Sequence, residues 1–418
     1  MSSLTIMGGY PITGEIKIQG SKNSALPLLA ASLLIKGITV LEHCPDISDV
    51  SCMLEILKAL GCTVVREAET VIIDAGELKC STVAKKDAKK MRSSIALLGA
   101  LLGRQGEAHI PLPGGCSIGK RPIDLHLMAL RRLGAEIEEK EELHAKLWAC
   151  QDAEILFPYP SVGALQNAIL ASVLSEATVV LKNCAREPEI VELCEFLNHA
   201  GANIKGGGTD TIVVRGVKLL HEVCYTVRSD RIVAGTYLCM AAATRGNVTV
   251  CGVDPFEMSA LTEVFARMGC MLQQYSDAIT LAVKGRVGGI SLLKTTPYPG
   301  FPTDMQSQIM SVLTLASGNS VIRETVFENR FRTVYELQKM QADITVNEKE
   351  QLAVVRGREY ITSARLCAQD LRGGAALVVA ALAAEGVSVI EDREYIERGY
   401  EDITGVIRSL GGDCRLNG

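Results

Sequence analysis

One pattern of about seventy residues recurs six times along the 418-residue chain. In each copy, an apolar run of helical length leads through a turn into a short stretch rich in β-branched residues. The turns fall near residues 37, 106, 176, 246, 318 and 386. Self-similarity at a fixed period predicts a repeat architecture. This feature therefore constrains the fold more than any other property of the sequence.

A second, amphipathic helix follows in each copy and ends at a regular landmark. The landmarks are Leu60-Gly61, Leu133-Gly134, Ala200-Gly201, Met268-Gly269, Met340-Gln341 and Leu410-Gly411. Glycine suits this place because the residue after a helix often has a left-handed backbone. The fifth copy has Gln341 instead, so we expect its cap to differ. Because a further β-rich stretch follows each cap, each repeat is predicted as helix-strand-helix-strand-strand.

The first helix of each copy is apolar on nearly all sides, as in residues 375–382. Such a helix belongs inside a core. Three repeats would bring three buried helices together, with sheets and amphipathic helices outside. Since a chain of this length exceeds one ordinary core, we expect an α/β protein of two similar domains that divide near residues 227–231.

Composition excludes several classes of protein. The net charge of −5 argues against general nucleic-acid binding. Apolar stretches of about twelve residues at most are too short to span a membrane. The 14 cysteines form no CxxC pair, so we expect no metal site and no redox motif. Without a visible signal peptide, reduced thiols in the cytoplasm are expected.

Polar residues mark the starts of the six buried helices. They are Ser21-Lys22-Asn23, Met91-Arg92-Ser93, Ser161-Val162-Gly163, Asp230-Arg231, Pro302-Thr303-Asp304 and Asp370-Leu371-Arg372. Free N–H groups and a partial positive charge make helix N-termini suited to anions. The plainer interpretation is that Asp and Ser cap the helices while Lys and Arg are solvated. Both interpretations remain open at this point.

The connection at residues 111–122 is rich in proline and glycine, which is typical of a mobile lid. Its Cys116 is expected to be exposed near Lys120 and Arg121, although a tolerated surface thiol is the plainer alternative. Arg330 and Arg398 occupy equivalent connections of the last two copies. The cations that fall at one end of the repeats, and would converge in a closed fold, are Lys22, Arg92, Arg121, Arg330, Arg372 and Arg398.

Five motifs together resemble the UDP-N-acetylglucosamine 1-carboxyvinyltransferases, the enolpyruvyl transferases that open peptidoglycan synthesis. They are residues 20–23, 112–126, 301–306, 324–330 and 370–372, and the resemblance covers essentially the whole chain. It implies an inside-out α/β barrel of two domains with three repeats each. One domain would span residues 21–229 and include the lid at about 111–122. The other would combine residues 1–20, whose strand packs there, with residues 230–418.

The resemblance also implies a reaction. Phosphoenolpyruvate would be joined to the 3-hydroxyl of UDP-N-acetylglucosamine through a tetrahedral intermediate, with release of phosphate and no cofactor. Lys22, Arg121 and Arg398 would bind the phosphate, and Asn23 the intermediate. Arg330 and Arg372 would hold the carboxylate.

The same resemblance assigns the proton-transfer and sugar-nucleotide roles. Asp304 would be the general base. Cys116 would protonate the enol carbon and react with phosphoenolpyruvate or fosfomycin-type epoxide phosphonates. The UDP-sugar would be held by Arg92, Arg121, Pro122, Ile123, Asp124, Leu125, Ser161, Val162, Gly163, Asp304 and Val326.

One departure and two alternatives bear on this prediction. Some family members have a lysine for the diphosphate just before Ser161, whereas residues 157–160 contain none. The 3-phosphoshikimate 1-carboxyvinyltransferases resemble the chain in fold and chemistry, but Asn23 and Cys116 favour the UDP-sugar enzymes. A regulatory homologue without turnover would be expected to lack a catalytic group, yet Lys22, Cys116, Asp304 and Arg398 are present.

Overall fold

A computed structural model describes residues 2–88, 91–112 and 122–417. These residues fall into two units of three repeats each. The N-terminal unit comprises residues 20–88, 91–112 and 122–228, and the C-terminal unit comprises residues 2–19 and 229–417. Cys116 and Arg121 lie outside the described residues. Within the described part of the chain, no helix combines the length and apolar character needed to cross a membrane.

The N-terminal unit contains repeats 1 to 3. Repeat 1 has α1 (Lys22–Ala31), η1 (Ser32–Leu34), β3 (Ile38–Glu42), α2 (Ser48–Leu60), β4 (Thr63–Glu67) and β5 (Thr70–Asp74). Repeat 2 has α3 (Lys85–Ala88), η2 (Arg92–Ile95), α4 (Ala96–Gln105), β6 (Glu107–Pro111), α5 (Asp124–Arg132), β7 (Glu136–Glu139) and β8 (Glu142–Lys146). Repeat 3 has β9 (Ala153–Leu156), α6 (Val162–Ser172), β10 (Thr178–Lys182), α7 (Pro188–His199), β11 (Asn203–Lys205) and β12 (Thr211–Arg215). The unit also holds β13 (Val223–Thr226).

The C-terminal unit contains repeats 4 to 6. Repeat 4 has α8 (Arg231–Thr244), β14 (Asn247–Cys251), α9 (Ser259–Arg267), β15 (Met271–Gln274) and β16 (Ala278–Ala282). Repeat 5 has β17 (Leu293–Lys294), η3 (Thr303–Met305), α10 (Gln306–Leu313), β18 (Asn319–Arg323), η4 (Arg330–Arg332), α11 (Thr333–Lys339), β19 (Asp343–Asn347) and β20 (Leu352–Arg356). Repeat 6 has β21 (Arg365–Cys367), α12 (Leu371–Ala383), β22 (Gly386–Glu391), η5 (Arg393–Tyr395), α13 (Ile403–Ser409) and β23 (Asp413–Asn417). The first strands of the chain, β1 (Ser3–Gly8) and β2 (Thr13–Lys17), also belong here.

The six repeats are confirmed, but the predicted order omits one strand. A short strand before the buried helix runs parallel to the strand after it, as β9 does beside β10 and β21 beside β22. Among the described residues, five sheets therefore have four strands, whereas the sheet of repeat 2 has three strands, β6, β7 and β8, and only a single parallel bridge between Thr82 and His109 in place of the added strand. These added strands have only two to five residues, too few for a clear alternation of apolar and polar side chains.

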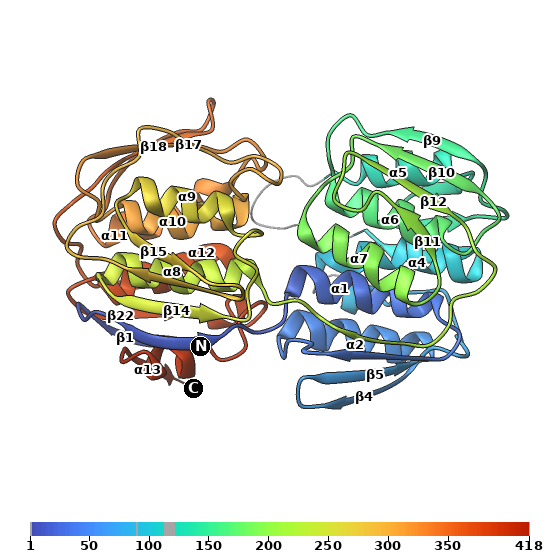
Figure 1. Cartoon of the computed structure of the whole chain (residues 1–418), viewed down its shortest axis with the longest axis horizontal. Helices are drawn as coiled ribbons and strands as arrows, with labels where there is room; N and C mark the ends of the chain where they lie inside the picture. The colour runs from blue at the N-terminus through green and yellow to red at the C-terminus, as the bar shows by residue number, and fades with distance from the viewer. Residues whose placement is uncertain (1, 89–90, 113–121, 418) are drawn as a thin grey trace. The chain divides into compact units, whose positions relative to one another are not determined.

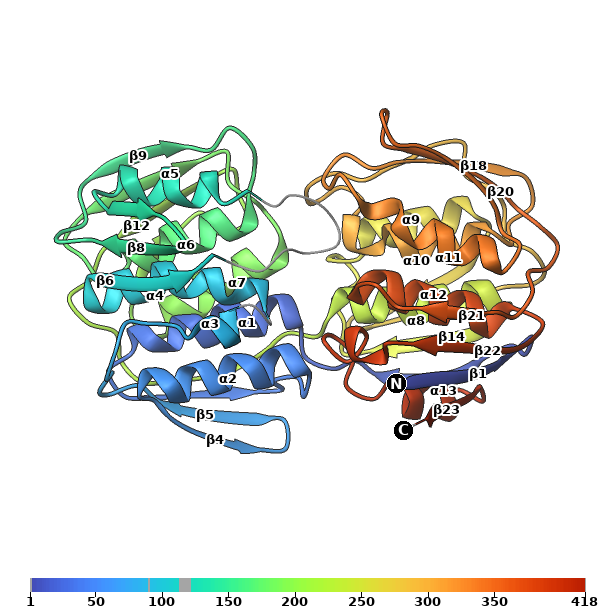
Figure 2. The same cartoon turned by 180° about the vertical axis from the view of Figure 1, so that it is seen from behind.

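Two of these short strands are exchanged between the units. β2 precedes α1 in the chain, yet it pairs with β14 of repeat 4. β13 precedes α8, yet it pairs with β3 of repeat 1. In addition, β1 lies antiparallel between β22 and β23, so it completes the sheet of repeat 6 (Figure 2). Residues 2–19 are therefore structural members of the C-terminal unit.

The buried helices of each unit run in the same direction. Gly99 N of α4 donates to Asn167 Oδ1 of α6 at 2.6 Å, and further along Gly103 packs against the backbone of Leu170 and Ala171. In the other unit, Gln308 Nε2 of α10 donates to Thr236 of α8, and Ser311 Oγ donates to the carbonyl oxygen of Ala376 in α12. Figure 1 shows α8, α10 and α12 side by side. The starts of these helices consequently share one end of their unit.

The helix caps correct one prediction. Gly61, Gly134, Gly201, Gly269 and Gly411 all have positive φ, as expected for a left-handed cap. Gln341 was expected to differ, yet it also has a positive φ of 65°. The cap is therefore common to all six repeats, and repeat 5 adopts it with a side chain that disfavours this backbone.

Candidate active site

Asp304 lies between two arginines at the start of α10. Its Oδ1 accepts a hydrogen bond from Arg330 Nη2, and its Oδ2 accepts from Arg372 Nη2 at 2.9 Å and Nε at 3.2 Å. The arginine side chains are 3% and 5% exposed, whereas the Asp304 side chain is 25% exposed. An incoming group therefore meets the carboxylate before it meets the two cations.

Arg330 is held in place by a chain of polar groups. Its Nε donates to Thr303 Oγ1 at 3.3 Å, and Thr303 Oγ1 donates to Glu324 Oε2 at 2.9 Å. The other oxygen of Glu324 accepts from the backbone N–H groups of Val326 and Phe327. The same buried carboxylate thus fixes the turn at Val326, a predicted UDP-sugar position, and supports the arginine.

Arg372 is fixed from the first turn of α12. Asp370 caps this helix by accepting from the N–H groups of Arg372 and Gly373 at 3.0 and 2.9 Å, so its capping interpretation is confirmed. Burial by itself would lower the pKa of Arg372. The charge of Asp304, with smaller contributions from Tyr400 and Asp230, outweighs burial and holds that pKa above its usual value.

Two other predicted residues belong to the C-terminal unit. Asp230 caps α8 by accepting from the N–H groups of Ile232 and Val233. Arg398 is half-buried in the segment between η5 and α13. Nearby, Tyr400 is fully buried, and its hydroxyl forms a 2.8 Å hydrogen bond with Thr236. Burial raises the pKa of Tyr400, so this hydroxyl stays protonated.

Lys22 occupies the first turn of α1 in the N-terminal unit. Its Nζ lies 2.6 Å from Asp49 Oδ2, and the two side chains are 10% and 5% exposed. Ser21 caps α1 by accepting from Ser24 N, and Asn23 is half-buried in the same turn. Asp49 was not among the predicted site residues, because its only signal in the sequence is an acidic residue in the first turn of α2, and such residues are common.

The predicted UDP-sugar positions of this unit gather at the starts of α5 and α6. Ser161 caps α6, with Val162 and Gly163 in its first turn, while Asp124 and Leu125 begin α5. Gly163 packs against the His126 ring of α5, where a Cβ would come within 2.8 Å. The absence of a side chain at Gly163 therefore allows the two helix starts to approach.

Asn167 extends this contact to α4. Its Nδ2 lies 2.7 Å from His126 Nδ1 and donates to the carbonyl oxygen of Ile95 at 3.0 Å. With the Gly99 bond, Asn167 ties three helix starts together. Just before α5, Pro122 is exposed and Ile123 is half-buried. Arg92 begins η2, and its side chain is not among the described ones.

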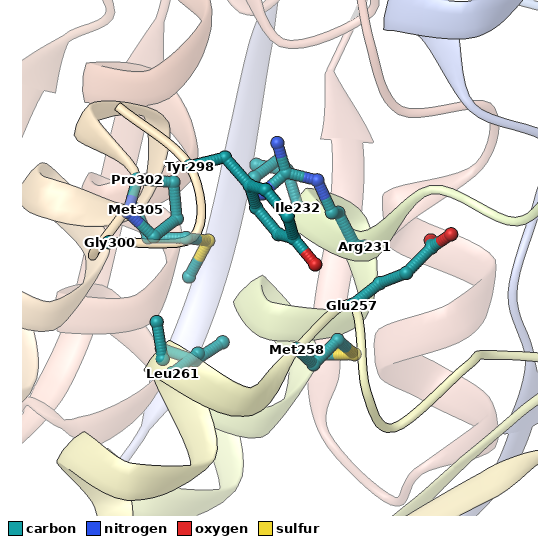
Figure 3. Close-up of a pocket in the computed structure, with 10 residues that line it drawn as sticks. Arg231, Ile232, Glu257, Met258, Leu261, Tyr298, Gly300, Pro302 and Met305 are labelled. Atoms are coloured by element: carbon teal, nitrogen blue, oxygen red, sulfur yellow. The ribbon is translucent and has the colours of Figure 1, made fainter. Parts of the chain in front are cut away.

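A small pocket adjoins Asp304 along the chain. Figure 3 shows Arg231 near Tyr298, with Pro302 and Met305 on another side; the guanidinium lies 5.7 Å from the Tyr298 ring centroid. The lining is mainly apolar and includes neither Arg330 nor Arg372. The groups suited to anions and proton transfer are therefore those around Asp304, and the pocket is a neighbour of that cluster.

Comparisons with known proteins agree over the whole length of the chain. The family EPSP synthase (3-phosphoshikimate 1-carboxyvinyltransferase) matches residues 6–407. UDP-N-acetylglucosamine 1-carboxyvinyltransferase 2 of Caldanaerobacter subterraneus subsp. tengcongensis is 46% identical over 99% of both chains. The UDP-N-acetylglucosamine 1-carboxyvinyltransferase of Clostridium botulinum is 43% identical over 98% of this chain and 99% of its own.

Solved structures show the same fold. The enolpyruvyl transferase NikO from Streptomyces tendae has a TM-score of 0.89 at 23% identity, covering 100% of this chain and 99% of that one. EPSP synthase from Acinetobacter baumannii has a TM-score of 0.77 at 17% identity, with 100% of both chains covered. The predicted two-domain α/β architecture of the enolpyruvyl transferase type is thereby confirmed.

Proposed function

The chain belongs to the EPSP synthase family of enolpyruvyl transferases, and from that premise we propose that it is a UDP-N-acetylglucosamine 1-carboxyvinyltransferase. It transfers the enolpyruvyl group of phosphoenolpyruvate to the 3-hydroxyl of UDP-N-acetylglucosamine and releases phosphate. Full-length relatives at 43–46% identity carry that name. The EPSP synthase structures are only 17% identical and support the fold alone. The observation that carries the proposal is the carboxylate of Asp304 between two buried arginines.

The arginines suit the carboxylate of phosphoenolpyruvate. A guanidinium presents a planar fork of donors that matches a carboxylate, and burial strengthens the attraction. Because Asp304 occupies both forks, the substrate carboxylate has to take its place. Asp304 would then be available to accept the proton of the sugar hydroxyl as general base. Substrate binding and activation of the base are thereby coupled.

The remaining roles follow from the family resemblance. Lys22, Arg121 and Arg398 bind the phosphate group, and Asn23 contacts the tetrahedral intermediate. The sugar nucleotide is held by Arg92, Arg121, Pro122, Ile123, Asp124, Leu125, Ser161, Val162, Gly163, Asp304 and Val326. The clustering of Asp124–Leu125 with Ser161–Gly163 supports this assignment within the N-terminal unit.

Cys116 is proposed to protonate the enol carbon and to be the residue that epoxide phosphonates of the fosfomycin type alkylate. Mass spectrometry should find this adduct on Cys116, formed faster when UDP-N-acetylglucosamine is present. Prior alkylation of another cysteine would contradict the assignment. The described cysteines are all free thiols, which supports a cytoplasmic location, where peptidoglycan precursors would be made.

Phosphate release distinguishes the candidate functions. The purified protein should release phosphate from phosphoenolpyruvate when UDP-N-acetylglucosamine is added and not when shikimate 3-phosphate is added. Release with shikimate 3-phosphate alone would favour the rival activity. Calorimetric binding of UDP-N-acetylglucosamine without any phosphate release would favour a regulatory homologue.

A further inference from the structure

A group of metal-type ligands lies on the outer face of the β6–β8 sheet, among residues that the proposed reaction does not use. Glu107 and His109 are two positions apart on β6, and His144 lies directly opposite His109 on β8. Since side chains alternate along a strand, these three project from one face, while Ala108, Leu143 and Ala145 face the core. No metal site was expected from the cysteine spacing, and the ligands of this group are histidines and a carboxylate brought together by strand pairing.

The three side chains already converge. His144 Nε2 lies 3.0 Å and His109 Nε2 lies 3.4 Å from the same oxygen, Glu107 Oε1. One ligand atom from each residue lies within 4.8 Å of the others. Two imidazoles and one carboxylate are a ligand set that divalent zinc, cobalt and nickel ions accept. We propose that Glu107, His109 and His144 bind a divalent transition-metal ion.

The ring arrangement requires one adjustment. The imidazoles are stacked, with centroids 4.0 Å apart and planes inclined by 19°, so their Nε2 lone pairs do not yet meet at one point. Rotation of a ring about its broad χ2 torsion brings them together. The His109 and His144 side chains are 34% and 37% exposed, so solvent leaves room for this rotation.

The charge of this face also favours a cation. Glu138 of β7 is directly opposite His144, and Glu136 is directly opposite Lys146, so two more carboxylates project from the same side, although Lys140 Nζ already lies 3.0 Å from Glu138 Oε2. Lys146 opposes binding because its Nζ lies 3.4 Å from Glu107 Oε1. A bound metal must displace this ammonium, which provides a specific way to change the affinity.

The single tryptophan of the chain provides a reporter. Trp148 is 79% exposed, and the Lys146 ammonium lies 5.7 Å from its ring centroid. Lys146 therefore touches both the proposed site and the indole. Nickel bound to Glu107, His109 and His144 should quench Trp148 fluorescence in a saturable manner, because an open-shell ion close to an indole accepts its excitation energy.

The test is a nickel titration of the full chain in a non-chelating buffer. His109→Gln and His144→Gln should each weaken the nickel affinity measured by quenching by about tenfold or more, because loss of a second-shell partner alone costs about tenfold and each of these changes removes a ligand itself. His221→Gln, which changes another exposed histidine of the same unit, should leave it unchanged. Lys146→Met should tighten binding by about fivefold, the effect of removing one like charge near the surface.

Two outcomes would overturn the proposal: equal quenching in the wild type and His144→Gln, or quenching that rises linearly without saturation. Cysteine binding is checked with cobalt. The proposal requires that cobalt bound to the wild type absorbs visible light without the ultraviolet charge-transfer band of a thiolate ligand. The His144→Gln variant should lack this visible absorption. Thermal melting of each variant shows that the exposed substitutions leave the fold intact.

Discussion

Two groups of helix starts, one in each unit, are held together by different kinds of side chain. In the C-terminal unit, α10 and α12 are joined by charges, because Asp304 accepts from Arg372 and also from Arg330. In the N-terminal unit, α4, α5 and α6 are joined by an amide and an imidazole, Asn167 and His126. A carboxylate held by two arginines can be exchanged for another carboxylate, whereas Asn167 is held by two backbone groups and by the His126 ring.

This difference suggests a division of work between the units. In the proposed reaction, a substrate carboxylate replaces Asp304 at the arginines, and the displaced side chain then acts as the base. The network around Asn167 offers no such exchange, so it is suited to holding a fixed surface for the sugar nucleotide. The following predictions alter one side of this comparison at a time, beginning with the largest expected effect.

Replacing Asp304 should abolish turnover while substrates still bind. Asp304→Ala and the isosteric Asp304→Asn both remove the proposed base, and we expect phosphate release to fall by about 100- to 10,000-fold. Calorimetry should still detect binding of UDP-N-acetylglucosamine. Near-normal rates in either folded variant would remove Asp304 as the base. Because Asp304→Ala leaves two buried cations without their carboxylate, melting curves are needed for both variants.

Arg372→Lys should chiefly weaken phosphoenolpyruvate binding. The guanidinium donates through two nitrogens to Asp304, and an ammonium cannot reproduce that fork. Loss of a charge-assisted hydrogen bond costs about 2 kcal/mol, so KM for phosphoenolpyruvate should rise roughly thirtyfold. Arg356→Lys is the matched control, since Arg356 is half-exposed in a surface pair on β20. An unchanged KM in Arg372→Lys would contradict the proposed exchange of carboxylates.

Asp49→Asn tests the charged pair of the N-terminal unit. Lys22 and Asp49 are both buried, so removing the carboxylate takes a close, buried partner from the ammonium, and stability should fall by about 3 kcal/mol. Activity should fall less than in Lys22→Met, which removes the proposed phosphate ligand itself. Denaturant unfolding and steady-state kinetics of both variants give the comparison. Equal losses of activity would mean that Asp49 acts directly on the substrate.

Sequence reasoning predicted those features that depend on local pattern. The six apolar helices, the glycine caps of the amphipathic helices, and the helix starts that carry Lys22, Asp304 and Arg372 within their own units are all encoded by periodicity and spacing. The pairing of Asp304 with Arg330 and Arg372 was not predicted, because it depends on how neighbouring repeats are rotated about each other. Asp49 was missed for the same reason. The exchange of β2 and β13 depends on which sheet a short strand joins, and neither strand carries that information locally.

The smallest expected effect concerns the cap that repeats 4 and 5 achieve with different residues. Gln341 has a φ of 65°, whereas Gly269 has a φ of 82° with no atom within 4 Å of the position of an added Cβ. A left-handed backbone destabilises a non-glycine residue by about 1 kcal/mol relative to glycine. Glycine in turn loses more conformational entropy on folding, which offsets part of that difference.

Gln341→Gly should therefore raise the free energy of unfolding by about 0.5 kcal/mol, and the reciprocal Gly269→Gln should lower it by a similar amount. Chemical denaturation of the two single variants measures both changes. If the two variants change the free energy of unfolding by similar amounts with opposite signs, backbone strain accounts for the difference between these caps. Destabilisation by Gln341→Gly would show instead that the glutamine side chain makes contacts that stabilise repeat 5, and the cap of that repeat would then differ in energy although it shares its geometry.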